Sequence, residues 1–177
     1  MTIYNQPVYG SASKDTTNIE NILADTAVID AIQATAERAV TGSTAVMVTG
    51  DTLFTIEGGP IEILSLVSKC VTVNDDTEST LRYSANPTVG SATTISGASA
   101  SLASVAAGSG VVLNMTALAT APDILSPLVG LTGVHTRGII VNEGVITATV
   151  GVGSTTGTWK HYLRYRPLSP GVTVVGE

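Results

Sequence analysis

Cysteine, aromatic and charged residues are all scarce in this chain of 177 residues. The one cysteine, Cys70, has no partner for an internal disulfide, and with two histidines the chain has too few ligands for the common zinc sets. Aromatic residues make up 4% of the chain and charged residues 12%, so stability has to come from aliphatic packing and backbone pairing. We therefore expect no cofactor and no metal.

Basic residues are fewer than acidic ones, and the net charge is -6. Binding to phosphates needs a concentrated basic surface, so a nucleic-acid partner is not expected. No apolar run of membrane-spanning length occurs, so no membrane partner is expected either. The mean hydropathy of +0.36 predicts further apolar burial between subunits. The first residues, Met1–Asn5, lack the basic and apolar regions of a signal peptide, which favours residence in a reducing cytoplasm.

Catalytic motifs are also missing. There is no G-x-S-x-G elbow and no H-E-x-x-H sequence, and the glycine-rich stretch Gly151–Gly157 has neither the register nor the lysine of a phosphate-binding loop. Cys70 lies among apolar neighbours, which predicts an inert, buried thiol. The acidic stretch Asn74–Glu78 lacks the spacing of a calcium loop and is interpreted as a solvated hairpin turn. The sequence does not predict an enzyme.

Two pairs of strands are predicted around glycine-containing turns. Leu53–Glu57 and Ile61–Val73 flank Gly58-Gly59-Pro60, and Ile139–Val141 and Val145–Val152 flank a second turn. Both are interpreted as β-hairpins. Period-2 spacing predicts that one face of the 61–73 strand is buried through Ile61, Ile63, Val67, Val71 and Val73. Residues 88–110, rich in Gly, Ala, Ser and Thr, are interpreted as a long connection that offers shape and backbone contacts at most.

The last predicted strand, Trp159–Arg166, alternates between an apolar face and a cationic one. His161 belongs to the apolar face, where we expect a hydrogen-bonded, half-buried residue and not a catalytic base. The cationic face contains two candidate interaction residues, Arg164 and Arg166. It is suited either to an acidic neighbour or to a solvated edge strand protected by charge.

The N-terminal third predicts one helix. Thr17–Glu20 forms a capping box, the apolar periodicity continues to Thr41, and Gly42 suits the position after the helix. Isoleucines recur at heptad spacing, interrupted by polar residues that could set register in a short parallel bundle. The alternative is an amphipathic helix packed on its own β domain. The candidate contact residues are Ile19, Ile22, Ile29 and Ile32.

Residues 1–15 are interpreted as an extended arm, with a disordered terminus as the alternative. Tyr4 and Tyr9 are its only large side chains and are candidate docking residues. Residues 1–42 would thus serve anchoring or oligomerisation, and residues 43–177 would form the β domain. We expect a mainly β fold, an antiparallel β-sandwich or jelly-roll-like barrel preceded by the arm and the α-helix.

Three segments, NILADTAVIDAI, LFTIEGGPIEILSLV and HYLRYRPLSPGVTVV, resemble those of small virion structural proteins of tailed bacteriophages. They occur in order along the chain, and the last contains Tyr165-Arg166-Pro167-Leu168 followed by Gly171-Val172. The resemblance implies a capsid decoration (cement) protein or a fibre component, typically a homotrimer.

The first hypothesis is therefore a non-enzymatic decoration protein that stabilises the capsid of a tailed phage. Its partners would be further copies of itself and the major capsid protein or another virion protein. Its place would be the capsid surface of a virion, after synthesis in the host bacterial cytoplasm. A head or tail fibre or a tail-tip adaptor is the alternative of the same family. A carbohydrate-binding β module is a third hypothesis, which requires an exposed aromatic platform.

Overall fold

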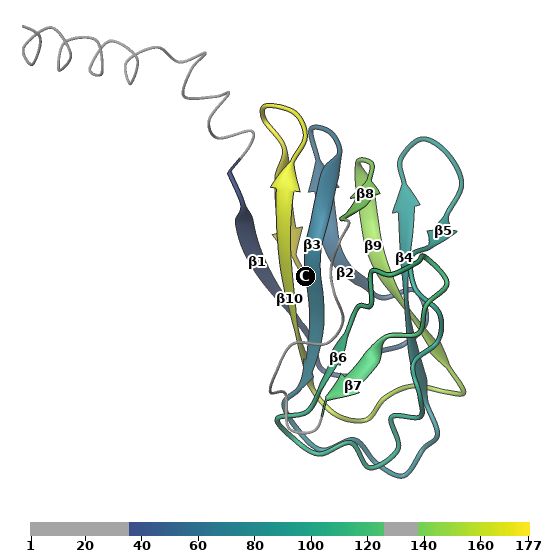
Figure 1. Cartoon of the computed structure of the whole chain (residues 1–177). Coiled ribbons are helices and arrows are strands. Elements are labelled where there is room, and N and C mark those ends of the chain that lie inside the picture. Colours follow the sequence, from purple (N-terminus) through teal and green to yellow (C-terminus); the bar gives the residue numbers. More distant parts are fainter. Residues whose placement is uncertain (1–35, 126–137) are drawn as a thin grey trace, which may run out of the picture.

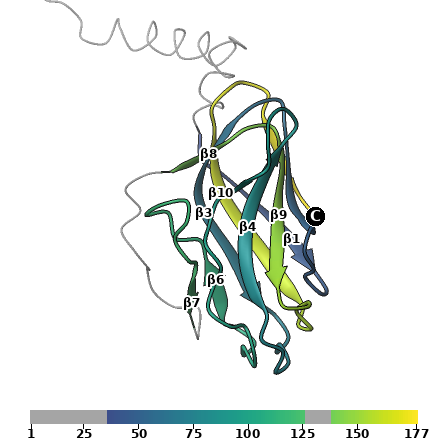
Figure 2. The ribbon, with the colours of Figure 1, turned by 90° about the vertical axis from the view of Figure 1, so that its right-hand side faces the viewer.

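The computed structural model describes residues 36–125 and 138–177, and within these ranges the chain forms two antiparallel sheets (Figures 1 and 2). Sheet A has the order β1-β10-β3-β6-β7, with β8 also paired to β3, and sheet B has the order β11-β2-β9-β4-β5. The strands are β1 (Arg38–Thr44), β2 (Thr52–Glu57), β3 (Ile61–Cys70), β4 (Thr80–Pro87), β5 (Thr93–Thr94), β6 (Gly110–Val112), β7 (Asp123–Leu125), β8 (Ile139–Val141), β9 (Gly144–Gly151), β10 (Trp159–Pro167) and β11 (Thr173–Gly176).

The two sheets enclose one hydrophobic core, to which each contributes one face. The long strands alternate between buried and more exposed residues, as period-2 apolar spacing requires when only one face of a sheet is covered. The largest fully buried side chains are Trp159, Tyr83, Phe54, Met47 and a set of leucines and isoleucines. The expectation of a mainly β, antiparallel fold is confirmed for the described residues, among which no α-helix occurs.

The two predicted hairpins are not hairpins. β2 lies in sheet B and β3 in sheet A, and likewise β8 lies in sheet A and β9 in sheet B. The turns at Gly58-Gly59-Pro60 and at Asn142-Glu143 therefore carry the chain from one sheet to the other. The sequence signals for a turn between two strands were correct, but such signals do not distinguish strands that pair from strands that face each other across a core.

A bulge in β3 changes which residues are buried. Arg164 of β10 pairs with Ser65 and Tyr165 pairs with Ile63, so Leu64 has no residue opposite it. One extra residue reverses the alternation, and Leu66 is buried while Val67 faces outwards. The predicted face was thus correct at Ile61 and Ile63 and wrong beyond them. The strand itself ends at Cys70, and Val71 and Val73, also predicted to be buried, are 46% and 61% exposed.

The low-complexity segment between β5 and β6 covers the edge of β4. The backbone N–H groups of Ile95, Ser99 and Leu102 donate to the carbonyl oxygens of Tyr83, Leu81 and Ser79 at 3.0, 2.9 and 2.7 Å. In return, the hydroxyl oxygens of Ser96 and Ser99 each accept from an N–H of β4 at 2.9 Å. Small residues suit this task, because an uncovered edge with free N–H and C=O groups would pair with other chains. The expected connection is thus interrupted by the two-residue strand β5, and the expectation of backbone contacts alone is wrong, because the hydroxyls of Ser96 and Ser99 take part.

The prediction that the helix continues to Thr41 is wrong. Residues Arg38–Thr41 belong to β1, where Val40 packs partly buried against the core, so the heptad series cannot include it. Strand pairing with β10 overrides the helical pattern here, because β1 supplies the edge of sheet A. Sheet A thus begins before the predicted division at residues 42 and 43. Residues 17–35 of the helix lie outside the described residues.

The turn between β2 and β3 generates a stability prediction. Gly58 has a φ of +80°, and a Cβ at this position would lie 2.7 Å from the carbonyl oxygen of Gly171. Gly153 has the same φ of +80°, but there the nearest atom is Cγ2 of Thr77 at 3.9 Å. Both Gly→Ala variants bear the backbone strain, whereas only Gly58→Ala must also displace backbone atoms. We expect Gly58→Ala to lower the free energy of unfolding by about 1–3 kcal/mol more than Gly153→Ala.

Chemical denaturation of the two variants beside the unchanged protein measures this difference. Equal losses of stability would mean that the loop from β10 to β11 moves aside freely.

Candidate interaction surface

The two candidate arginines lie on the outer face of sheet A. Lys160, Tyr162, Arg164 and Arg166 alternate along β10 with buried Trp159, His161, Leu163 and Tyr165, which confirms the predicted faces of this strand. β10 lies between β1 and β3, so the interpretation as an edge strand is wrong. Directly paired residues share a face, and therefore Ala39 and Thr41 of β1 and Ser65, Val67 and Lys69 of β3 belong to this outer face.

The positive charges of this face are only partly neutralised. Arg164 donates to Oε2 of Glu37 at 2.7 Å, and Arg166 donates to Oε2 of Glu62 at 2.8 Å. Arg166 also lies 3.7 Å from Oε1 of Glu37. Such exposed pairs orient side chains and add little stability. Lys69 and Lys160 are direct partners across β3 and β10, and within the described ranges neither has a carboxylate within salt-bridge distance.

An apolar row crosses the same face. The register places Thr41, Tyr162, Val67 and Val112 in line on β1, β10, β3 and β6. Tyr162, Val67 and Val112 are all half-buried. A shallow depression of about 530 Å³ is lined by Thr41, Tyr162 and Val67 of this row. Lys69 and Arg164 also line it. The face therefore suits a partner that is both apolar and acidic.

The other candidate interaction residues belong to the first 35 residues of the chain. Tyr4, Tyr9, Ile19, Ile22, Ile29 and Ile32 lie outside the described residues. The chain enters the described region at residue 36, and Glu37 already lies over the outer face of sheet A through its contacts with Arg164 and Arg166. The segment that contains the isoleucines is thus attached at the margin of this face.

A buried polar cluster links the two sheets. His161 of β10 contacts Oγ1 of Thr44 through Nε2 at 3.0 Å and Oγ of Ser68 through Nδ1 at 2.8 Å. The hydroxyl of Tyr83, on β4 of sheet B, donates to the same Ser68 oxygen at 2.8 Å. Ser68, Tyr83 and His161 are completely buried. His161 is hydrogen-bonded as expected, but it is fully buried where half-burial was expected.

The Ser68–His161 pair resembles a nucleophile and its base, but it is not built for catalysis. No substrate reaches a completely buried hydroxyl, and the Ser68 oxygen already interacts with both His161 and Tyr83. Burial lowers the pKa of His161 to about 4 and raises that of Tyr83, so both side chains are neutral near pH 7. Burial likewise raises the pKa of the Cys70 thiol, consistent with the inert cysteine that the sequence predicts.

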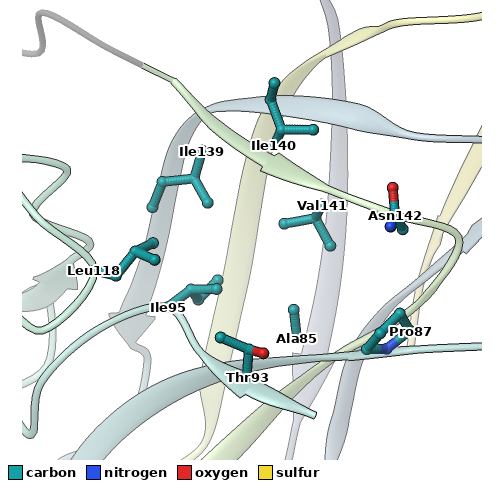
Figure 3. Close-up of a pocket in the computed structure, with 9 residues that line it drawn as sticks. All are labelled: Ala85, Pro87, Thr93, Ile95, Leu118, Ile139, Ile140, Val141 and Asn142. Carbon is teal, nitrogen blue, oxygen red and sulfur yellow. The ribbon is translucent and has the colours of Figure 1, made fainter. Parts of the chain in front are cut away.

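A smaller pocket lies between β8 of sheet A and β4 and β5 of sheet B (Figure 3). It has a volume of about 190 Å³, below the usual range of small-molecule sites. Ile139 and Val141 line it from β8, and Ala85 and Ile95 line it from the opposite side. The side chains of Thr93 and Asn142 are its only polar ones, and no lining residue is titratable. It can hold an apolar group but has no means to transform one.

One structurally important residue was missed in the sequence. Asn74, assigned to a solvated turn, is buried and joins three loops. Its side-chain nitrogen donates to the carbonyl oxygen of Leu102 at 2.8 Å, and its side-chain oxygen accepts from the N–H groups of Thr156 and Gly157 at 2.8 and 3.2 Å. Because β3 and β4 lie in different sheets, this stretch is not a hairpin turn. An asparagine at the start of an acidic loop gave no signal of these distant partners.

In the part of the chain that the structure describes, no three His, Cys, Asp or Glu side chains gather as they would around a metal ion. No helix in the described ranges is long and apolar enough to cross a membrane. Comparisons of the chain with protein-family models, with curated proteins and with solved structures find no match.

The buried histidine predicts a pH dependence of stability. The pKa of His161 is about 4 in the folded protein and near 6.5 in the unfolded chain, so the unfolded state binds more protons between these values. The stability due to neutral His161 is complete above pH 6.5 and is lost as pH falls through 4, with a slope approaching about 1.4 kcal/mol per pH unit. The His161→Gln variant lacks this contribution. The difference in free energy of unfolding between the unchanged protein and this variant should therefore decrease as the pH is lowered.

Urea denaturation of both proteins at pH values from 7.5 to 4.5 measures this difference in free energy of unfolding directly. Carboxylates titrate in both proteins and cancel in the difference. A gap that stays constant over this range would mean that His161 does not titrate on unfolding.

Proposed function

We propose that this protein is a non-enzymatic structural subunit of a virion, an oligomeric decoration protein on the capsid of a tailed phage. The observation that carries the proposal is the strand order. The short strands β7 and β11 lie at the ends of the two sheets, and β8 lies beside β3. When the other eight strands, β1 to β6, β9 and β10, are counted from first to eighth, they have the order 1-8-3-6 in sheet A and 2-7-4-5 in sheet B. This is the order of a jelly roll, a fold of viral capsid domains, lectins and cupins. The resemblance of three segments to phage virion proteins favours the first of these uses.

The two other uses of the fold find less support. A carbohydrate-binding module needs aromatic side chains that present a flat, exposed surface. Phe54, Tyr83 and Trp159 are completely buried, Tyr165 is 4% exposed, and Tyr162 is half-buried. A cupin-type metal enzyme needs convergent histidines and carboxylates, and no such group occurs in the described ranges. Fold alone does not decide function, so the choice among these three uses of the fold rests on the residues that each use would need.

The proposed assembly is a homotrimer with the β domain outermost. Support comes from the resemblance and from the apolar composition, which predicts burial between subunits. Residues 1–15, with Tyr4 and Tyr9, would anchor the subunit to the major capsid protein. An arm this poor in apolar residues gains too little burial by itself to offset its backbone entropy, so a neighbouring subunit has to supply the contacts.

Removal of residues 1–13 should separate attachment from folding. We expect the truncated protein to keep the melting temperature of the full chain and to bind empty capsids at least about tenfold more weakly, since the lost tyrosine contacts contribute only at the capsid. Sedimentation of mixtures of protein and empty capsids measures the binding, and a Tyr4→Phe, Tyr9→Phe variant is the matched control, because it keeps the rings.

Unaltered decoration by the truncated protein would overturn the anchoring role. Cryo-electron microscopy of the parent particle tests the wider proposal. Density for this chain on the capsid surface is the expected result, and density confined to the tail would favour the fibre or tail-tip alternative.

A further inference from the structure

We propose that residues 15–35 of the same chain dock on the outer face of sheet A. The proposal is independent of the virion role, because it concerns the isolated protein. It rests on the chemistry of the face, the composition of the segment and the point at which the chain enters β1.

The outer face of sheet A contains two like charges that repel each other. Lys69 and Lys160 are directly opposed on β3 and β10, and like charges at opposed positions destabilise a sheet. The nearby carboxylates of Glu37 and Glu62 are engaged with Arg164 and Arg166. A further anionic group above the two lysines would therefore be stabilising. In a chain of net charge -6, four of the eight basic residues lie on this one face.

The face also has apolar surface to cover. Tyr162, Val67 and Val112 form a half-buried row. The depression of about 530 Å³ includes Tyr162 and Val67 of this row and extends over β1, β10 and β3. The opposite outer face, that of sheet B, also has apolar residues, since Val145 and the 53% exposed Val175 both pair with Thr55 of β2. Its basic side chain among the described residues is Arg82 on β4, which pairs with Thr149 of β9. The surplus of positive charge therefore distinguishes the outer face of sheet A.

The segment 15–35 has the complementary composition. It contains four acidic residues and no basic one, and six large aliphatic residues recur in it at helical spacing. The acids are Asp15, Glu20, Asp25 and Asp30, and the large aliphatics are Ile19, Ile22, Leu23, Val28, Ile29 and Ile32. An amphipathic segment of this kind can place its apolar side on the Tyr162 row and its carboxylates near the lysines.

The chain's entry point favours the segment's own face over that of a second copy. Glu37 contacts both arginines of the outer face, so the segment starts at the margin of the depression. A covalently attached segment has a high effective concentration at such a site, which intermolecular docking lacks.

Cross-linking in the full-length protein tests the proposal. One variant combines Thr26→Cys with Ser65→Cys on the outer face of sheet A, and its matched control combines Thr26→Cys with Thr149→Cys on the outer face of sheet B. Residue 26 is eleven residues from Glu37, a reach of about 36 Å, so an undocked segment would approach both faces. Both proteins are treated at low concentration with a short bismaleimide. The Thr26→Cys variant alone, which also contains buried Cys70, gives the background.

We expect the Ser65 pair to form an intramolecular link about tenfold faster than the Thr149 pair. The double substitution Lys69→Glu, Lys160→Glu should abolish most of the preference for the Ser65 pair. Adding Asp25→Lys and Asp30→Lys to that variant should restore the preference, because the two signs of charge are then exchanged. Trp159 fluorescence checks that each variant is folded, since this side chain is completely buried. Three results would each overturn the proposal. These are equal cross-linking rates for the two pairs, cross-links formed only between molecules, and a preference for the Ser65 pair that persists in the Lys69→Glu, Lys160→Glu variant.

Discussion

The structure depends on the burial of one face of each sheet against the other. Consecutive strands from β1 to β4 alternate between the sheets, and so do those from β8 to β11, so neither sheet can form from neighbouring strands alone. Thr44, for example, pairs with Trp159, far away in the sequence. Most pairing energy is therefore gained only after long segments have been ordered, and such a topology folds slowly. The low-complexity segment between β5 and β6 then covers the edge of β4, which would otherwise stay unpaired.

Within this apolar interface, the cluster of Thr44, His161, Ser68 and Tyr83 is the main polar interruption. Aliphatic side chains tolerate a shift of one strand along another, whereas a chain of buried hydrogen bonds does not, because each group left without a partner would be costly. The cluster joins β1, β10 and β3 with β4 of the facing sheet. It thus suits a role in fixing the register of the strands, and Asn74 does the same for the loops at one end.

The two outer faces differ because the charges are distributed unevenly over an acidic chain. Among the described residues, every aromatic side chain except Tyr162 is buried in the core, and Lys69, Lys160, Arg164 and Arg166 share the outer face of sheet A. An interaction surface can therefore arise without any catalytic or metal-binding group. The proposed docking of residues 15–35 and the proposed attachment to a capsid use different parts of the N-terminal third, so both can operate in one subunit.

The sequence by itself determined the mainly β class, the alternating faces of β10 with Arg164 and Arg166 outwards, and the inert Cys70, because the alternation of side chains is a local property of a strand. Only the tertiary structure decided that the turns at Gly58-Gly59-Pro60 and Asn142-Glu143 cross between sheets, that a bulge turns Val67 outwards, and that Arg38–Thr41 form a strand. It also brought Lys69 opposite Lys160 and Tyr83 to Ser68. These features depend on which strands become neighbours, and that choice is made by burial of the whole core, which no local pattern contains.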